Sequence, residues 1–200
     1  GGKMRGLKLS NGEYLQADHV ILAVGHSARD TWARLAEQGV PFEPKPFQLG
    51  LRIEHPQELI DRGRYGAAAS QLGAASYNLL CKAGDGLPTG YSFCMCPGGR
   101  IVPAINEPGL LCTNGMSNSR HNTPFGNSGL VVTLEPDEFG SSHPLAGVEL
   151  QRKFESAAFR LAGSNYKSPI QSASDFLASR APDASASFAC SYQRGVHPVD

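Results

Sequence analysis

The N-terminal residues carry the patterns of short strands. Leu7 and Leu9 alternate with polar residues, and Asn11-Gly12 then supplies the pair that a two-residue type I′ turn requires. Residues 20–24, Val-Ile-Leu-Ala-Val, form an unbroken apolar run that ends at Gly25. Because a strand without a polar face has to be covered on both sides, this run predicts a strand in the parallel sheet of an α/β domain.

A helix is predicted directly after Gly25. Ser27 is expected to be its N-cap, with Asp30 three residues further on, and Gly39 stands where a C-cap belongs. One helical face collects the apolar residues of this segment, Ala28, Trp32, Leu35 and Ala36. The unit is therefore strand, glycine and helix, and the helix N-terminus lies beyond the carboxyl end of the strand, where ligands bind in open α/β sheets.

Three prolines within residues 41–46 indicate a linker that leaves one domain for another. After it, residues 47–54 alternate apolar and polar side chains, which predicts a half-buried strand. A short helix is expected from Pro56 to about Ile60. The remaining stretches are predicted strands at 91–96, 100–104, 110–113 and 130–134, a predicted helix at 145–161, a weak pattern at 63–90 and no clear pattern at 164–191.

Composition narrows the classes of protein. The 200 residues carry 18 basic and 18 acidic side chains, and this zero net charge argues against a nucleic-acid-binding protein, which usually has a basic excess. No apolar run reaches the length of a membrane span, and the first residues lack the pattern of a signal peptide. The five cysteines are an odd number without zinc-binding spacing, so we expect a reduced, cytoplasmic protein with no metal site.

Gly25 is the first candidate site, because a residue without a side chain lets a cofactor approach the backbone. A strand–helix turn that simply requires glycine explains the same residue equally well. The stretch with His26 and Ser27 also resembles the G-x-S-x-G turn of hydrolases, but Arg29 stands where that motif has its second glycine. A hydrolase is therefore the weakest of the functions considered.

Two small groups of residues after the linker carry reactive or charged side chains. Arg52, Glu54 and His55 lie together on or beside one predicted strand and could bind an anion or move a proton, although an ordinary surface ion pair explains the first two as well. On a regular strand, Cys94 and Cys96 would share one face about 6–7 Å apart, too far for an easy disulfide. Both are interpreted as buried structural thiols, with a redox thiol facing a cofactor as the alternative.

Small polar residues gather between positions 113 and 128. Asn114, Ser117 and Asn127 supply hydrogen-bond donors and acceptors, and Arg120 supplies a cationic fork. These residues could line a pocket for a carboxylate or a phosphate, and a solvated loop is the alternative. The chain contains no G-x-G-x-x-G motif and no P-loop.

Four ordered segments of the chain, 20–31, 45–57, 91–99 and 113–128, are similar to segments of bacterial FAD-dependent dehydrogenases of uncertain substrate. These are two-domain flavoproteins among the NAD(P)/FAD-dependent oxidoreductases. The resemblance implies an α/β fold, with residues 1–42 as a segment of a Rossmann-like FAD domain and residues 43–200 as an inserted α+β domain with a mixed sheet. The dinucleotide-binding loop and the closing flavin segment of the family are expected to lie outside these 200 residues.

The resemblance implies a function as part of an FAD-dependent dehydrogenase, with an inserted domain that covers the flavin and shapes the substrate site. NAD(P) is a candidate electron partner, and the substrate is an unidentified small molecule. The expected FAD contacts are Ala23, Gly25, His26 and Ser27. The expected residues beside the flavin or the substrate are Arg52, His55, Cys94, Cys96, Asn114, Ser117, Arg120 and Asn127. Arg120 is expected to clamp an anion and Cys94 to act as a redox or polarising group. The alternative is a binding or interaction module without chemistry of its own.

Overall fold

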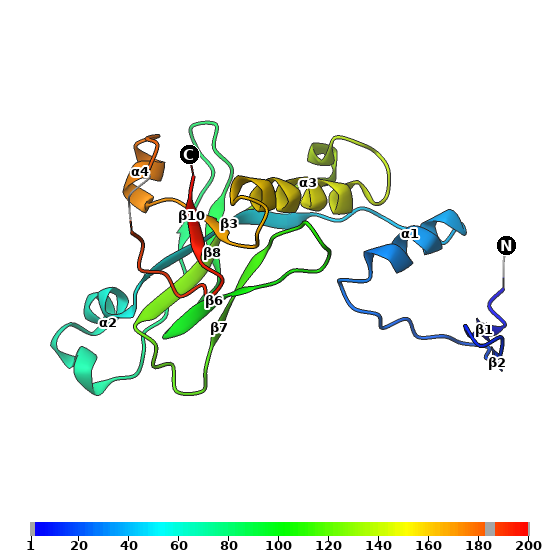
Figure 1. The fold of residues 1–200 in the computed structure, drawn as a ribbon, viewed down its shortest axis with the longest axis horizontal. Coiled ribbons are helices and arrows are strands. Elements are labelled where there is room, and N and C mark those ends of the chain that lie inside the picture. The colour runs from blue at the N-terminus through cyan, green and yellow to red at the C-terminus, as the bar shows by residue number, and fades with distance from the viewer. Residues whose placement is uncertain (1–2, 183–186, 200) are drawn as a thin grey trace. The chain divides into compact units, whose positions relative to one another are not determined.

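The structure, a computed structural model, describes residues 3–182 and 187–199. The chain divides into two compact units, Gly1–Pro41 and Phe42–Asp200, which are described separately (Figure 1). The described residues form four α-helices and several small sheets, most of them antiparallel, so the fold is mixed α/β.

The first unit begins with the predicted hairpin, of β1 (Gly6–Lys8) and β2 (Tyr14–Gln16). Its turn differs from the prediction. The Gly12 N–H donates to the Leu9 carbonyl at 3.0 Å, and Gly12 takes a positive φ of 89°, whereas Asn11 does not. The loop is therefore the three-residue kind with glycine in the left-handed region, and the type I′ turn was wrong because β1 ends before the pair that suggested it.

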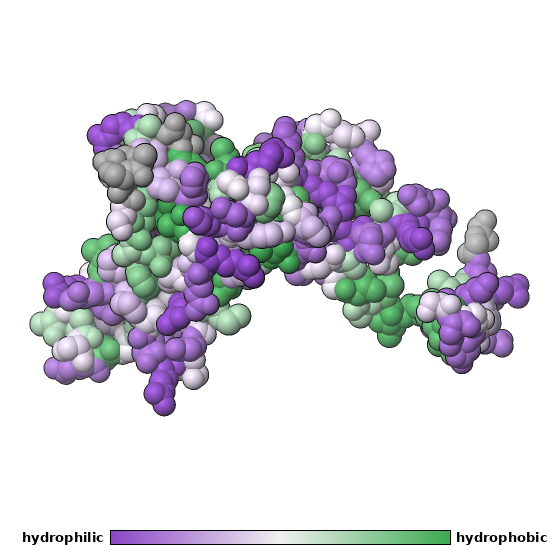
Figure 2. Space-filling view, in the orientation of Figure 1, coloured by the Kyte–Doolittle hydropathy of each residue, from purple (hydrophilic) through white to green (hydrophobic). Residues whose placement is uncertain are grey.

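The run over residues 20–24 does not form the strand that its apolar pattern predicts. It has no ladder partner, and Ile21 is 93% exposed. Figure 2 shows hydrophobic surface along this part of the chain, between β2 and α1. A strand needs neighbours to satisfy its backbone groups, and the described part of this unit offers only the β1–β2 hairpin. The structure therefore shows no Rossmann-like segment here.

The predicted helix is α1 (Arg29–Glu37). Its N-cap is Ala28 with no capping side chain, so the capping role predicted for Ser27 was wrong. The predicted helix end is confirmed to within one residue, since the C-cap is Gln38 and Gly39 follows it. Gly39 takes a φ of 80° and donates to the Ala36 carbonyl at 3.0 Å, and the next amide reaches back to the residue before Ala36. This is the Schellman ending that glycine permits.

The second unit is built on a four-stranded antiparallel sheet in the order β3-β8-β5-β4 (Figure 1). Its strands are β3 (Phe47–Pro56), β8 (Phe125–Leu134), β5 (Gly90–Cys96) and β4 (Leu80–Cys81). The predicted strands over 47–54 and 91–96 are confirmed, while β8 begins five residues before the predicted 130–134. The earlier part of β8 escaped prediction because its Gly, Asn and Ser residues have low strand propensity.

A two-stranded hairpin packs against this sheet. It consists of β6 (Gly99–Pro103) and β7 (Thr113–Ser117), which contact β8 and β5 respectively. The prediction placed the second of these strands at 110–113, just before its actual position. The remaining elements are α2 (Gln57–Tyr65), α3 (Ala146–Leu161), α4 (Ala173–Leu177), β9 (Ser168–Ile170), β10 (Val196–Pro198) and two 3₁₀ turns, Gly66–Gln71 and Pro136–Phe139.

The helices predicted from position 56 and over 145–161 are thus confirmed, and the first runs further than expected. The start of α3 packs where β3 begins: the rings of Phe47 and Phe139 lie 5.1 Å apart, and Gly147 of α3 sits against both. This packing anchors α3 at one end of β3, and the predicted polar residues of the sheet lie toward the other end.

Candidate functional site

The register of the main sheet places three polar residues in one row. Glu54 of β3 pairs with Asn127 of β8, which pairs with Cys96 of β5. Residues opposite each other in a ladder point to the same face, and so does Arg52, two positions before Glu54. Strand pairing thus gathers candidates that lie far apart in the sequence.

Two amide oxygens hold the Arg52 guanidinium on this face. Its Nη1 donates to Asn127 Oδ1 at 2.7 Å, and its Nη2 donates to Asn114 Oδ1 at 3.1 Å. Asn127 is fully buried, and its Nδ2 has no hydrogen-bond partner among the described residues. Asn114 is exposed, so the group opens to solvent on the side of β7. The contacts between Arg52 and the two asparagines define what we call the Arg52 cluster, with Cys96 beside it.

Gly115 of β7 lies directly over the Arg52 cluster. A Cβ added there would lie 2.2 Å from Asn127 Oδ1, 2.4 Å from Arg52 Nη1 and 2.8 Å from Cys96 Sγ. No side chain fits in that space, so glycine is what lets the hairpin approach the sheet. Sequence reasoning missed this residue because nothing but the fold brings β7 over β8.

Cys94 and Cys96 lie at a β-bulge, where the pairing of β5 with β8 skips from Phe93 to Cys96. Cys94 is exposed and takes a positive φ of 46°, so the interpretation of both residues as buried structural thiols was wrong for Cys94. The Cys96 thiol donates to the Cys94 carbonyl at 3.3 Å. Burial raises the pKa of Cys96, and the neighbouring Arg52 only partly offsets that rise, so this thiol stays protonated at neutral pH.

His55 belongs to the opposite face of the sheet, since it follows Arg52 at an odd spacing. Its Nε2 lies 3.0 Å from the Tyr77 hydroxyl. Burial raises the pKa of Tyr77, while a hydrogen bond from Ser128 and the charge of Arg52 act in the other direction. Tyr77 comes from the weakly patterned stretch 63–90, and the sequence offered no signal for it.

Ser117 and Arg120 lie beyond the Arg52 cluster. The Ser117 hydroxyl donates to the Pro97 carbonyl at 2.8 Å, which ties β7 to the turn after β5. Arg120 is exposed in the loop between β7 and β8, where its backbone amide donates to Asn118 Oδ1. Among the described residues, the hydrogen bonds of these two residues go to groups outside the cluster, and the anion-clamping role of Arg120 stays a prediction.

The four FAD contacts predicted in the first unit, Ala23, Gly25, His26 and Ser27, are all exposed. Gly25 takes a φ of 81°, and nothing lies within 4 Å of the Cβ that it lacks. His26 Nε2 lies 3.4 Å from Ser27 Oγ. These residues are accessible to a ligand, and their role toward FAD also stays a prediction.

A second polar group extends the row on the β3 side. The Ser191 amide donates to Glu54 Oε2 at 2.8 Å, its hydroxyl also bonds the Glu54 carboxylate, and Ile101 donates to that hydroxyl at 2.8 Å. Burial raises the pKa of neighbouring Cys190 to about 11. A cleft of about 360 Å³ opens here; Arg100, Thr123, Pro124, Phe125 and residues 190–193 line it. No pattern of residues predicted a site in this segment.

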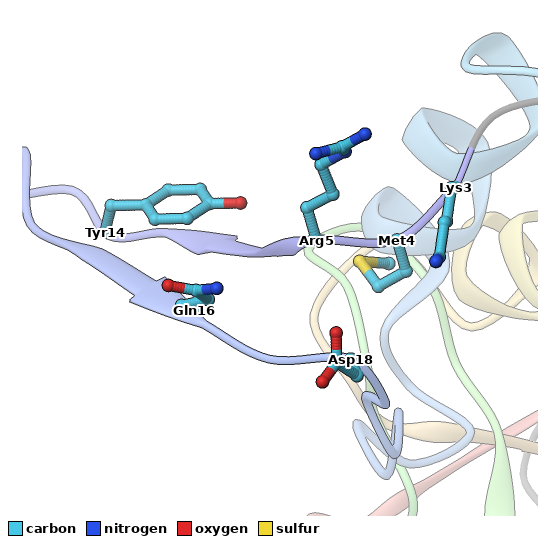
Figure 3. A pocket seen from close by; sticks show the side chains of 6 residues that line it. All are labelled: Lys3, Met4, Arg5, Tyr14, Gln16 and Asp18. Carbon is cyan, nitrogen blue, oxygen red and sulfur yellow. The ribbon is translucent and has the colours of Figure 1, made fainter.

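The first unit has a hollow of its own, of about 300 Å³, on the hairpin. Figure 3 shows its side chains reaching from both strands and the residues beside them: Lys3, Met4, Arg5, Tyr14, Gln16 and Asp18. None of them is a predicted site residue. Across the described residues, no three His, Cys, Asp or Glu side chains form a group that could hold a metal ion, and no helix is long and apolar enough to cross a membrane.

Comparison with known proteins shows the family to which the chain belongs. A family model described as "FAD-dependent protein, C-terminal domain-like" matches residues 46–200, so the chain belongs to this family. An uncharacterized protein of Clostridium beijerinckii is 45% identical over 182 residues, which is 90% of this chain and 34% of that protein. The chain therefore spans about a third of the length of the curated relative that it matches.

Proposed function

We propose that this chain is part of an FAD-dependent oxidoreductase, a dehydrogenase, whose second unit covers the flavin and shapes the site of a small-molecule substrate. The observation that carries the proposal is the family match over residues 46–200. In such enzymes the flavin supplies the hydride or electron chemistry. The task of this chain is then to bind and orient the substrate and to exclude water.

The first unit offers independent support. An apolar run that lies exposed, with Ile21 93% accessible, suits a strand that pairs with a further sheet. The segment with Gly25 after this run would then lie at the carboxyl end of that strand, where a helix N-terminus favours the diphosphate of a dinucleotide. Ala23, His26 and Ser27 would lie at the same edge.

The polar face of the second unit supports the substrate part of the proposal. Arg52, Asn114 and Asn127 offer directed hydrogen bonds, and Cys96 beside them is a neutral thiol. A neutral thiol is a poor nucleophile. Cys96 therefore acts by packing and polarity, and Cys94, which is exposed, remains the candidate redox thiol.

The test uses the longer protein that contains this chain. We expect the purified protein to be yellow, to release FAD on denaturation, and to be bleached anaerobically by NADH or NADPH. A colourless protein with no affinity for added FAD would refute the proposal. Titration of the 200 residues alone with FAD then separates a cofactor-binding piece from a module that only covers the flavin: we expect at most weak binding.

A further inference from the structure

Arg52 is a half-buried cation that forms no ion pair with an acidic side chain among the described residues. Its hydrogen bonds in this part of the chain go to uncharged groups, the amide oxygens of Asn127 and Asn114 and the Cys96 thiol. A guanidinium has five N–H donors, more than these bonds use, so donors remain for other acceptors. The site therefore holds positive charge that the sheet itself does not balance.

Asn127 adds a second donor in the same place. Because Arg52 Nη1 can only donate, Asn127 must present Oδ1 to it, and this fixes the orientation of the amide. The other end of the amide, Nδ2, is buried and has no partner among the described residues. A buried donor without an acceptor costs about 1–3 kcal/mol. Both donors call for an acceptor, and the guanidinium favours one that carries negative charge.

We propose that the Arg52 cluster binds the carboxylate of a small-molecule ligand, with Arg52 as the cationic fork, Asn127 as a further donor and Asn114 as the group that holds the fork on its exposed side. The inference rests on the proposed function in one respect: the ligand is then the substrate of the flavoenzyme. The carboxylate approaches the guanidinium from the side of exposed Asn114, because Gly115 of β7 fills the space next to Arg52 Nη1, Asn127 Oδ1 and Cys96 Sγ.

Charge selects a carboxylate over a phosphate. The cluster contains one positive side chain, and Glu54 shares its face of the sheet. A single guanidinium balances one negative charge, whereas a phosphate dianion calls for more donors or a second cation. Glu54 is bonded to Ser191 and forms no ion pair with Arg52 among the described residues, but its negative charge opposes a second negative charge nearby. The chemistry that fits is a monoanionic, planar carboxylate.

The binding test uses the 200-residue chain without flavin. Acetate, benzoate and inorganic phosphate are titrated at constant ionic strength, and amide chemical-shift changes are followed by NMR. We expect saturable changes at residues 52, 114, 115 and 127 with both carboxylates and weaker effects with phosphate. Phosphate binding tighter than benzoate would overturn the assignment to a carboxylate.

Three variants locate the site. Arg52→Lys keeps the charge but loses the fork, and we expect benzoate affinity to fall about tenfold or more. Asn127→Asp places a built-in carboxylate against Arg52 in the same shape, so we expect a folded protein that no longer binds benzoate. Arg62→Lys is the matched control, because Arg62 is an exposed arginine paired with Glu58; it should bind like the wild type.

Two further outcomes would contradict binding of a carboxylate at the Arg52 cluster. Arg120→Lys tests whether Arg120 binds the carboxylate instead of Arg52. Loss of benzoate affinity in Arg120→Lys, together with unchanged affinity in Arg52→Lys, would overturn the proposal. Unchanged benzoate binding in Asn127→Asp would overturn it as well. Because these measurements need no flavin, they separate the two ideas. A longer protein that contains FAD while this chain fails to bind carboxylates refutes only the present inference, and the reverse result refutes only the proposed function.

Discussion

Replacing Gly115 by alanine tests whether β7 lies on the Arg52 cluster as closely as the structure shows. The new Cβ would lie 2.2 Å from Asn127 Oδ1 and 2.4 Å from Arg52 Nη1, and real Cβ atoms essentially never approach another atom within 3.0 Å. The Arg52 side chain is flexible, but Asn127 is fully buried and has no room to withdraw. The hairpin therefore has to lift, or the hydrogen bond between the two side chains has to break.

Two unfavourable effects determine how far Gly115→Ala lowers the free energy of unfolding. Forcing an extra methyl group into a close-packed site costs about 1–3 kcal/mol. Separating Arg52 from Asn127, now 2.7 Å apart, removes a hydrogen bond to a charged group and leaves the amide oxygen without a donor, a loss of about 1.5–3 kcal/mol. We therefore expect the free energy of unfolding to fall by about 2–5 kcal/mol, since the two effects overlap in part.

Urea denaturation followed by circular dichroism measures this change. The matched control is Gly73→Ala, because nothing lies within 4 Å of the Cβ that Gly73 lacks; it should alter stability by no more than about 0.5 kcal/mol. A Gly115→Ala protein as stable as this control would show that β7 does not lie against Arg52 and Asn127. The geometry behind the carboxylate site would then be wrong.

Three further predictions follow from buried groups in the second unit. Gln57→Ala should cost about 2–4 kcal/mol in urea denaturation, because the buried Gln57 amide donates to the Ala75 carbonyl at 2.9 Å and accepts from the Gly98 N–H at 2.8 Å; a loss below about 1 kcal/mol contradicts this. Iodoacetamide at pH 8, read by mass spectrometry, should label exposed Cys94 well before Cys190, whose pKa burial raises to about 11; equal rates would show that Cys190 is not protected. The folded state also binds the Cys190 proton more tightly than the unfolded chain does, so this contribution to stability is complete below about pH 8.5 and is lost as the pH rises toward 11. Thermal melts should show a steeper loss across that range for the wild type than for Cys190→Ala, and parallel curves would refute the linkage.

The elements that local pattern alone decides were predictable. The alternation over 47–54 becomes β3, the apolar stripe over 145–161 becomes α3, and Gly39 ends α1 as expected. These depend on side-chain period and on the backbone freedom of one glycine, both of which are properties of neighbouring residues.

The predictions that were wrong share one cause. The run over 20–24 has the pattern of a buried strand but no partner strands in its unit, and β8 begins with residues of low strand propensity that β3 and β5 hold in place. Strand formation depends on hydrogen bonds to other segments, so tertiary context overrides local preference here. The bulge that exposes Cys94 has the same origin in the pairing of two strands.

The sequence by itself determined which chemical groups are present: one arginine on the polar side of a strand, the asparagines of the segment 113–128 and the two neighbouring thiols. Only the tertiary structure decided that Arg52 and the two asparagines meet and that Gly115 covers them. Composition and the periodicity of apolar side chains specify which chemical groups each strand or helix carries. Register between strands distant in the chain specifies what each group meets, because a shift of one residue turns every side chain to the opposite face.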